Sequence, residues 1–318
     1  MPILIRRLLQ IAVVFVVVTF FTVALMSLVP GSPETVVIPF DATGGELRDQ
    51  FRSENHLDRP LVIQWANWAK DFVTGDLGNY YTSTGTDPVS DRVTRAAPVT
   101  ALLIVYTQVL SLAVAIPVAV FAAYRAGGKR DRALGFLAYG AISLPNFALA
   151  LILTYLLGVR FSILPTRGYV GFGDSPIEHF KSMAIPVIAL SVGQIAVYMR
   201  LLRSDLVATL QEDFILMAKA KGVSNQRVLW RHALRPSSIT LLTVAGLNVG
   251  TLIGGSVVIE FLLGIPGLGL ELGNAIFARQ YVALQSLVAI VAITFVLINF
   301  LVDWLYTVVD PRIRERKS

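Results

Sequence analysis

The chain has 318 residues, of which 55% are hydrophobic and only 15% are charged, and its mean hydropathy is +0.66. Soluble domains carry about 25% charged residues, so this composition excludes a soluble globular protein and predicts an all-α protein that crosses a membrane several times. The absence of cysteine excludes a disulfide framework and cysteine metal ligands.

Six apolar stretches are long enough to cross a bilayer, which takes about 20 mostly apolar residues in a helix. The first stretch follows Arg6 and Arg7. Because its apolar run is long and no small-residue cleavage site follows, it is predicted to be a retained signal anchor. The six predicted spans are Leu8–Val29, Val99–Tyr124, Ala133–Gly158, Ala184–Leu202, Ser237–Leu263 and Leu284–Val309.

Lysine and arginine are divided unevenly between the two sides that six spans define. Seventeen of the 27 lie in or beside the short segments 1–7, 125–132, 203–236 and 310–318, and ten lie in the longer segments of the other side. Short cytoplasmic segments carry the excess of basic residues, so both termini are predicted to be cytoplasmic. The pI of 9.6 then reflects topology and does not indicate binding to nucleic acid.

The outer segment 30–98 is long and is predicted to form a small folded region after the first span. Within it, Leu61–Phe72 has apolar residues at helical spacing, and the glycines of Gly75-Asp76-Leu77-Gly78 end that pattern. Trp65 and Trp68 fit two interpretations equally well. They lie either in the aromatic belt at the membrane interface or in a helix that packs over the bundle.

Acidic residues are scarce within the predicted spans. Glu260 and Asp303 are the two that occur there, and both lie near span ends, where a side chain can reach interfacial water. Charged groups at membrane depth usually mark ion or proton pathways, so this scarcity argues against an ion-coupled pump.

The fifth predicted span carries a row of small residues. Gly246, Gly250 and Gly254 are four residues apart and share one helix face, with Asn248 among them. A buried amide needs a hydrogen-bond partner in a dry environment. The row predicts a close helix contact, either within the bundle or with a second subunit.

The inner segment 203–236 contains two helical patterns separated by a glycine. Asp213 is placed to cap a helix over 214–221, which Gly222 is placed to end. Ser224 is placed to cap a second, basic helix over 225–234 that stops at Pro236. This surface suits either docking of a soluble partner or an amphipathic helix on anionic lipid.

This inner segment resembles the conserved inner loop of permease subunits of binding-protein-dependent ABC importers. That family's pattern is E-A-A-x-x-x-G, followed nine residues later by I-x-L-P. Ala218, Gly222 and Leu234 match it, whereas Leu216, Met217, His232 and Arg235 depart from it and a proline comes one residue late at Pro236. The dipeptide, oligopeptide and nickel branch reads like D-Y-V-R-T-A-x-A-K-G with a later H-A-L-R run. The residues that match this branch are Asp213, Ala218, Ala220, Lys221, Gly222, His232, Ala233, Leu234 and Arg235.

The resemblance covers nearly the whole chain. It includes Val29-Pro30-Gly31-Ser32-Pro33, the run 56–60, Tyr198–Ser204, Ile265–Gly269 and Asp310–Arg314, in the expected order. One departure is Arg279-Gln280-Tyr281-Val282, where the branch more often has Arg-Asp-Tyr-Pro.

The resemblance implies a type I ABC importer permease with six transmembrane helices, divided into an N-terminal helix and outer loop (1–98), a five-helix core (99–310) with an inner coupling loop (204–236), and a tail (311–318). It implies a second permease subunit, two ATP-binding subunits and an outer substrate-binding protein. ATP and magnesium would then bind the ATP-binding subunits, because this chain has no G-x-x-x-x-G-K-[ST] loop and needs no cofactor of its own.

Peptides are the cargo that the resemblance favours, with nickel chelates and glutathione as alternatives. A secondary transporter and a membrane scaffold are the alternative classes of function. The sequence shows no internal repeats of the kind that would support a secondary transporter. The residues expected to contact the ATP-binding subunits are Asp213, Ala218, Lys219, Ala220, Lys221, Gly222, Arg227, His232, Leu234 and Arg235. Those expected to face the binding protein are Glu260, Pro266, Gly267 and Gly269.

Overall fold

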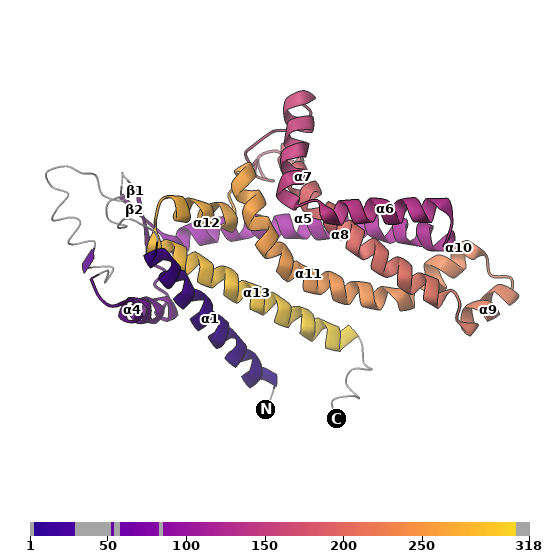
Figure 1. The fold of residues 1–318 in the computed structure, drawn as a ribbon, viewed down its shortest axis with the longest axis horizontal. Helices are drawn as coiled ribbons and strands as arrows, with labels where there is room; N and C mark the ends of the chain where they lie inside the picture. Colours follow the sequence, from indigo (N-terminus) through magenta and orange to yellow (C-terminus); the bar gives the residue numbers. More distant parts are fainter. Residues whose placement is uncertain (1–2, 29–51, 54–57, 83–84, 310–318) are drawn as a thin grey trace. The chain divides into compact units, whose positions relative to one another are not determined.

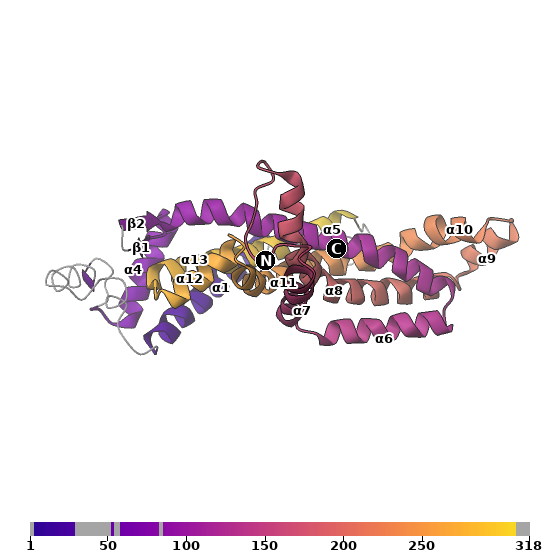
Figure 2. The same ribbon diagram turned by 90° about the horizontal axis from the view of Figure 1, so that it is seen from above.

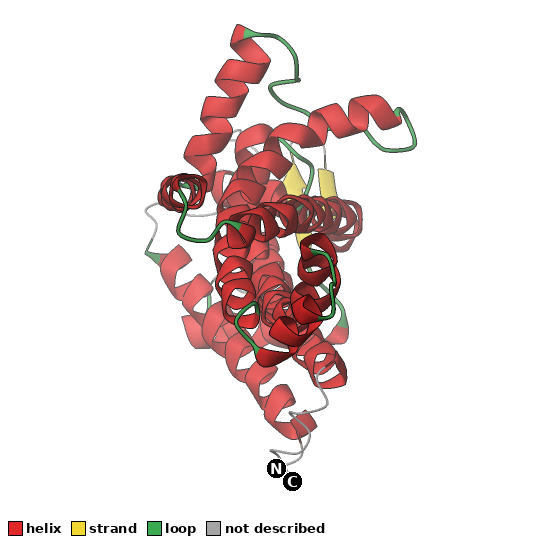
Figure 3. Ribbon diagram, turned by 90° about the vertical axis from the view of Figure 1, so that its right-hand side faces the viewer, coloured by secondary structure: helices red, strands yellow, loops and turns green. Residues whose placement is uncertain are grey.

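The computed structural model describes residues 3–28, 52–53, 58–82 and 85–309. Helix makes up almost all of their regular structure (Figures 1 and 3). The helices are α1 (Ile3–Ser27), α4 (Leu61–Thr74), α5 (Val89–Tyr124), α6 (Lys129–Ser143), α7 (Asn146–Leu153), α8 (Pro176–Thr209), α9 (Asp213–Ala220), α10 (Asn225–Arg227), α11 (Leu234–Leu263), α12 (Leu268–Phe277) and α13 (Tyr281–Val309), with π-helical segments η1 (Thr154–Arg160) and η2 (Val228–Ala233). Two short strands, β1 (Asn79–Thr82) and β2 (Gly85–Pro88), pair antiparallel and were not predicted.

Five helices among the described residues are long and apolar enough to cross a membrane, and a bent pair of helices adds a sixth if it counts as one span. The bent pair corrects the prediction of a continuous third span over 133–158. Here α6 and the helix of α7 with η1 meet at 98°, and Figure 1 shows the break between them. Leu144, at the break, is extended because the following Pro145 disfavours helical geometry in the residue before it.

The described chain forms two compact units. The first contains residues up to Ala101 together with Glu260–Leu297, and the second contains Leu102–Ile259 with the residues from Ile298 onward. The segment 260–297, assigned from sequence to the five-helix core, therefore groups with the N-terminal residues.

In the first unit, α4 packs against α1 and α13. Trp68 is buried, donates a hydrogen bond from its indole to Ser286 Oγ (3.0 Å), and stacks on Phe15. Trp65 donates its indole hydrogen to Thr19 Oγ1 at 2.9 Å. Both tryptophans thus donate hydrogen bonds to neighbouring helices. This favours the interpretation that their helix packs over the bundle, rather than the interpretation that they form an aromatic belt.

The strand pair is attached to the start of α13 by the side chain of Gln280. Its amide donates to the carbonyl oxygen of Tyr81 (2.7 Å) and accepts from the Tyr81 backbone N–H (3.0 Å). An aspartate, which is the more frequent residue of the resembling branch here, accepts but cannot donate when ionised. The departure at Gln280 therefore has a structural use. Burial raises the pKa of the neighbouring Tyr80 phenol.

In the second unit, a buried apolar cluster joins α5, α6, α8, η2 and α11. Ala115, Ala119 and Ala123 follow one another at intervals of four along α5 and are buried. Small side chains at this spacing allow close approach of a neighbouring helix. Tyr198 and Leu202 of α8 fill the same cluster, and this packing sets the position from which α8 leads into the inner loop.

Candidate functional site

The inner loop presents apolar side chains to solvent from a short helix. On α9, Phe214, Leu216 and Met217 are 47%, 54% and 58% exposed. Ile215 lies between them in sequence but is completely buried in the cluster of the second unit. One side of α9 is therefore held by packing while the other offers an apolar surface. We call Phe214, Leu216 and Met217 the α9 apolar face.

The loop is anchored around Ile215 by residues before and after it. Leu206 of α8 and Val228, Leu229 and Ala233 of η2 belong to the same buried cluster as Ile215. Thr209, the last residue of α8, shares a hydrogen bond of 2.9 Å with Ser237 of α11. In Figures 1 and 2, α9 and α10 project past the end of α6. The loop is thus a packed structure whose tip protrudes.

The end of α9 has the geometry that the sequence predicts. Gly222 has a φ of 76°, the left-handed conformation that glycine adopts without steric cost. Its N–H donates to Lys219 O, and Val223 N–H donates to Ala218 O. This pair of bonds is the Schellman motif, which satisfies carbonyl groups left free at a helix end.

The start of α9 differs from the prediction. Glu212, which has extended geometry, occupies the cap position, and Asp213 is the first helical residue. No side chain donates or accepts a capping hydrogen bond there. Asp213 still places a negative charge in the first turn, where it interacts favourably with the helix dipole.

The second predicted helix also differs, because it does not stop at Pro236. Ser224 is at the cap position without a side-chain bond, and a helical segment runs from Asn225 through η2 and α11 to Leu263. Pro236 has no N–H to donate to the carbonyl four residues earlier. The wider π-helical turn η2 directly precedes α11, which starts at Leu234. Such turns relax the strict pattern of helical hydrogen bonds, so the helix continues through the proline.

Most of the residues expected at the contact with ATP-binding subunits lie on the surface of this loop. Exposed ones are Asp213, Lys219, Ala220, Lys221, Gly222, Arg227 and Arg235, whereas Ala218, His232 and Leu234 are half-buried. The sequence interpretation missed the α9 apolar face. In the sequence, Leu216 and Met217 stand out only as departures from the family pattern, and the available signal is the continuous apolar run from Phe214 to Met217.

The residues expected to face a binding protein are mostly buried instead. Glu260 is fully buried, and its Oε2 accepts a hydrogen bond of 2.6 Å from Gly269 N–H at the start of α12. Gly267 is buried against Glu260 and Thr100, and only Pro266 is exposed. Three of the four expected contacts therefore build the turn between α11 and α12. Glu260 also does not reach interfacial water within this chain, and the side chain of Asp303 lies outside the described residues.

The glycine row of α11 faces different surroundings along its length. A side chain at Gly246 would come within 2.5 Å of Val302 Cγ1 of α13, so this glycine makes a close intramolecular contact. Gly250 is buried. Gly254 is exposed and has open space where a side chain would be. Asn248 donates a hydrogen bond of 2.9 Å to Gln194 of α8 and so has the partner its environment requires.

A model of the family described as "binding-protein-dependent transport system inner membrane component" matches residues 115–315, more than half of the chain. The chain belongs to this family. The match includes the inner loop, so the anchored α9 and its apolar face are parts of a permease component of the inner membrane. Several apolar helices agree with a multi-pass protein of that membrane.

Individual relatives cover the whole chain. A protein of Brucella abortus (strain 2308), whose name describes a permease of a peptide transport system, is 36% identical over 98% of both chains. The oligopeptide transport system permease protein AppB of Bacillus subtilis (strain 168) is 32% identical over 98% of both chains. The dipeptide transport system permease protein DppB of Escherichia coli (strain K12) is 32% identical over 99% of both chains.

Among the described residues, no three His, Asp or Glu side chains come together as a metal site. The inner loop instead combines apolar and basic side chains. Such a surface can bind another protein and transmit movement to the helices that continue from it.

Proposed function

We propose that this chain is a permease subunit of an ATP-driven importer of di- or oligopeptides, and that α9 couples ATP hydrolysis on partner subunits to movement of the spans. It forms half of the translocation pathway with a second permease subunit. It carries out no catalysis and holds no cofactor, and both termini lie in the cytoplasm. Two ATP-binding subunits dock on the inner side, and a substrate-binding protein delivers cargo on the outer side.

The observation that carries this proposal is the α9 apolar face on a firmly packed base. An exposed apolar helix at the basic side of a membrane protein needs a partner, because contiguous apolar surface is seldom left in water. The buried Ile215 and the Schellman motif at Gly222 hold α9 in place. A force applied to α9 is therefore transmitted to α8 and α11 as a rigid-body movement.

Peptide cargo follows from the names of the relatives. Those names describe peptide, oligopeptide and dipeptide transport systems, and their identity to this chain extends from end to end. The near absence of acidic residues in the spans supports energy input from ATP rather than from an ion gradient.

The test is purification of the tagged chain from its own membranes, followed by peptide uptake in cells that lack it. We expect an ATPase and a second permease to copurify, and uptake of labelled di- or oligopeptides to be lost and then restored by the gene. Recovery of the chain alone, together with unchanged peptide uptake, would reject the proposal.

A further inference from the structure

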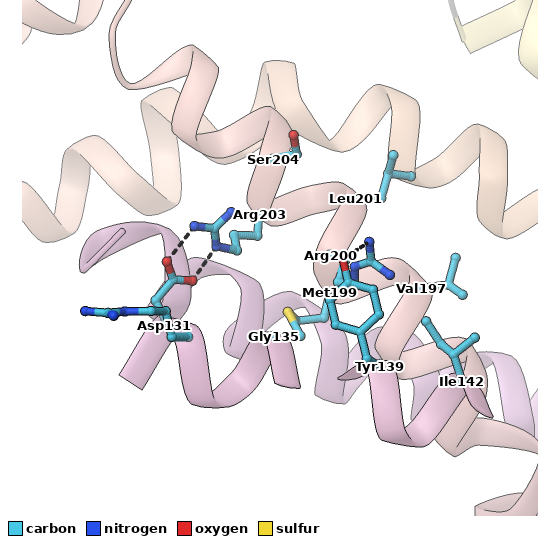
Figure 4. A pocket seen from close by; sticks show the side chains of 11 residues that line it. Asp131, Gly135, Tyr139, Ile142, Val197, Met199, Arg200, Leu201, Arg203 and Ser204 are labelled. Carbon is cyan, nitrogen blue, oxygen red and sulfur yellow. Dashed lines mark hydrogen bonds and ion pairs between the residues drawn. The ribbon is translucent and has the colours of Figure 1, made fainter. Parts of the chain in front are cut away.

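A groove between α6 and α8 of the second unit is used neither by the inner-loop contact nor by the turn at Glu260. It has a volume of about 610 Å³ and is lined by both helices. Figure 4 shows Asp131 and Arg203 at one end and Ile142 and Val197 at the other. The groove is therefore polar at one end and apolar at the other.

The lining of the groove carries net positive charge. Arg203 is engaged by Asp131, with which it forms two hydrogen bonds, and Asp131 also accepts from the backbone N–H of Gly127 at 2.8 Å. This pairing neutralises the one acidic side chain of the lining. Arg132 and Arg200, both exposed, also line the groove. Arg200 lies on Tyr139, between the Asp131 end and Ile142 (Figure 4), so a ligand with negative charge is favoured within the groove.

Arg200 is held in one orientation before any ligand arrives. Its guanidinium lies 4.1 Å from the centroid of the Tyr139 ring and donates a hydrogen bond of 3.1 Å to the Tyr139 hydroxyl. Arginine is suited to phosphate because its planar group presents several N–H donors together. An arginine fixed by stacking loses less conformational entropy when it binds.

The charge gradient follows the membrane normal that the proposed topology implies. Asp131 and Arg132 end the basic inner segment 125–132, and Arg203 and Ser204 begin the inner segment 203–236, so the polar end lies at the inner membrane surface. Ile142 lies about three helical turns from Asp131 along α6, and Val197 lies about two turns from Arg203 along α8, with Tyr139 and Arg200 between them. An ionic head and an apolar tail are arranged in this order in a phospholipid.

We propose that this groove binds one anionic phospholipid of the inner leaflet, with its phosphate at Arg200, its head group extending toward Arg132, and an acyl chain along Ile142 and Val197. Basic pockets between transmembrane helices on the cytoplasmic side are known sites for anionic head groups. The site depends on the proposed orientation of the chain but not on its cargo. A lipid bound there would contact both α6 and α8, and α8 leads into the inner loop. The packing of these two helices would then depend on the lipid composition of the membrane.

Gly135 offers a way to fill the groove without disturbing the fold. It lines the groove, and a side chain at this position meets no atom within 4 Å. Gly140 is a matched control on the same helix, because it also has open space but is not part of the lining. The role of charge is tested at Arg132 and Arg200, which line the groove. The exposed Arg130 does not line it and serves as the control.

The experiment uses the complete transporter complex, purified in detergent and examined by native mass spectrometry with added phosphatidylglycerol or phosphatidylcholine. We expect phosphatidylglycerol to be retained in preference to phosphatidylcholine. The double change Arg132→Gln/Arg200→Gln should lower its retention by about tenfold or more, as loss of a charged hydrogen bond implies. Gly135→Leu should lower retention to a similar extent, because its side chain fills the space of the acyl chain. Gly140→Leu and Arg130→Gln should retain it like the wild type.

Three results would overturn the proposal. The first is equal retention of phosphatidylglycerol by the groove variants and the controls. The second is stabilisation of the complex by inorganic phosphate alone that matches the lipid, which would indicate a site for a soluble anion. The third is loss of the second permease from Gly135→Leu with lipid retention unchanged, which would indicate a protein interface. If the complex with Gly135→Leu does not assemble, lipid retention by the double variant Arg132→Gln/Arg200→Gln tests the proposal.

Discussion

At the scale of single residues, Glu260 shows how an acidic side chain inside an apolar helix serves the fold. The first N–H groups of a helix have no partner within the helix. In α12, the N–H of Gly269 is bound by Glu260, and that of Leu268 is bound by Thr100 Oγ1 at 2.9 Å.

Replacing Glu260 therefore separates its role as an acceptor from its charge. Glu260→Ala leaves a buried N–H without its partner, and we expect a loss of about 1–3 kcal/mol in unfolding free energy. Glu260→Gln keeps an acceptor oxygen and should lose less. Thermal unfolding of the purified protein measures both. An equal melting temperature for Glu260→Ala and the wild type would show that the capping bond contributes nothing.

The glycine row gives a second contrast between residues. Gly246→Ala places a methyl group against Val302, and overpacking of this kind costs typically 1–3 kcal/mol. Gly254→Ala meets open space within this chain and should leave its stability unchanged. If Gly254 contacts the second permease, Gly254→Leu should reduce copurification of that subunit while the melting temperature of the chain stays the same. Full copurification with Gly254→Leu would remove Gly254 from that interface.

At the scale of elements, the end of α9 depends on the left-handed conformation of Gly222. A β-branched residue adopts this conformation only with strain of about 1–2 kcal/mol, whereas asparagine tolerates it better. We expect Gly222→Val to fray the last turn of α9 and to lower peptide uptake, with Gly222→Asn close to the wild type. Uptake is compared at equal membrane levels of the two variants. Equal uptake by Gly222→Val and Gly222→Asn would contradict this role for the turn.

The helices were largely predictable because their signals are local. Apolar runs identify the spans other than the third, helical spacing identifies α4, and Gly222 identifies the end of α9. Two prolines show what the local sequence does not predict, namely whether a helix continues past a proline. Both Pro145 and Pro236 disfavour helix, yet the chain bends by 98° at the first and continues as helix through the second. The helix that contains Pro236 begins directly after the π-helical turn η2, whereas α6 ends at Ser143, before Pro145, and neither feature is visible in the local sequence.

The candidate site was predictable in position but not in detail. The pattern around Gly222 identified the loop, whereas the exposure of Phe214, Leu216 and Met217 depends on which side of α9 is buried. Similarly, the sequence near Glu260 identified a distinctive segment. Its burial follows from contacts with Thr100 and Gly269, of which Thr100 is distant in sequence.

At the scale of the whole molecule, the bent pair of helices decides the topology. If α6 and α7 with η1 together cross the membrane, residues before and after them lie on opposite sides. The chain has no cysteine, so a maleimide can label only a cysteine that is introduced by mutation. We expect Gly173→Cys, at an open and exposed position, to react with a membrane-impermeant maleimide in intact cells, and Ala126→Cys to stay protected. Matching reactivity at both positions would mean that the pair does not cross.

The central claim is that the α9 apolar face transmits ATP hydrolysis to peptide passage. The most direct measurement is peptide-stimulated ATP hydrolysis by the reconstituted complex with its binding protein. Met217→Glu puts a charge into this face, and we expect stimulation to fall at least about tenfold, because a buried unpaired charge is costly at an interface. Gln211→Glu adds the same charge at an exposed position outside the face and should stay near the wild type. Wild-type stimulation with Met217→Glu would contradict the account.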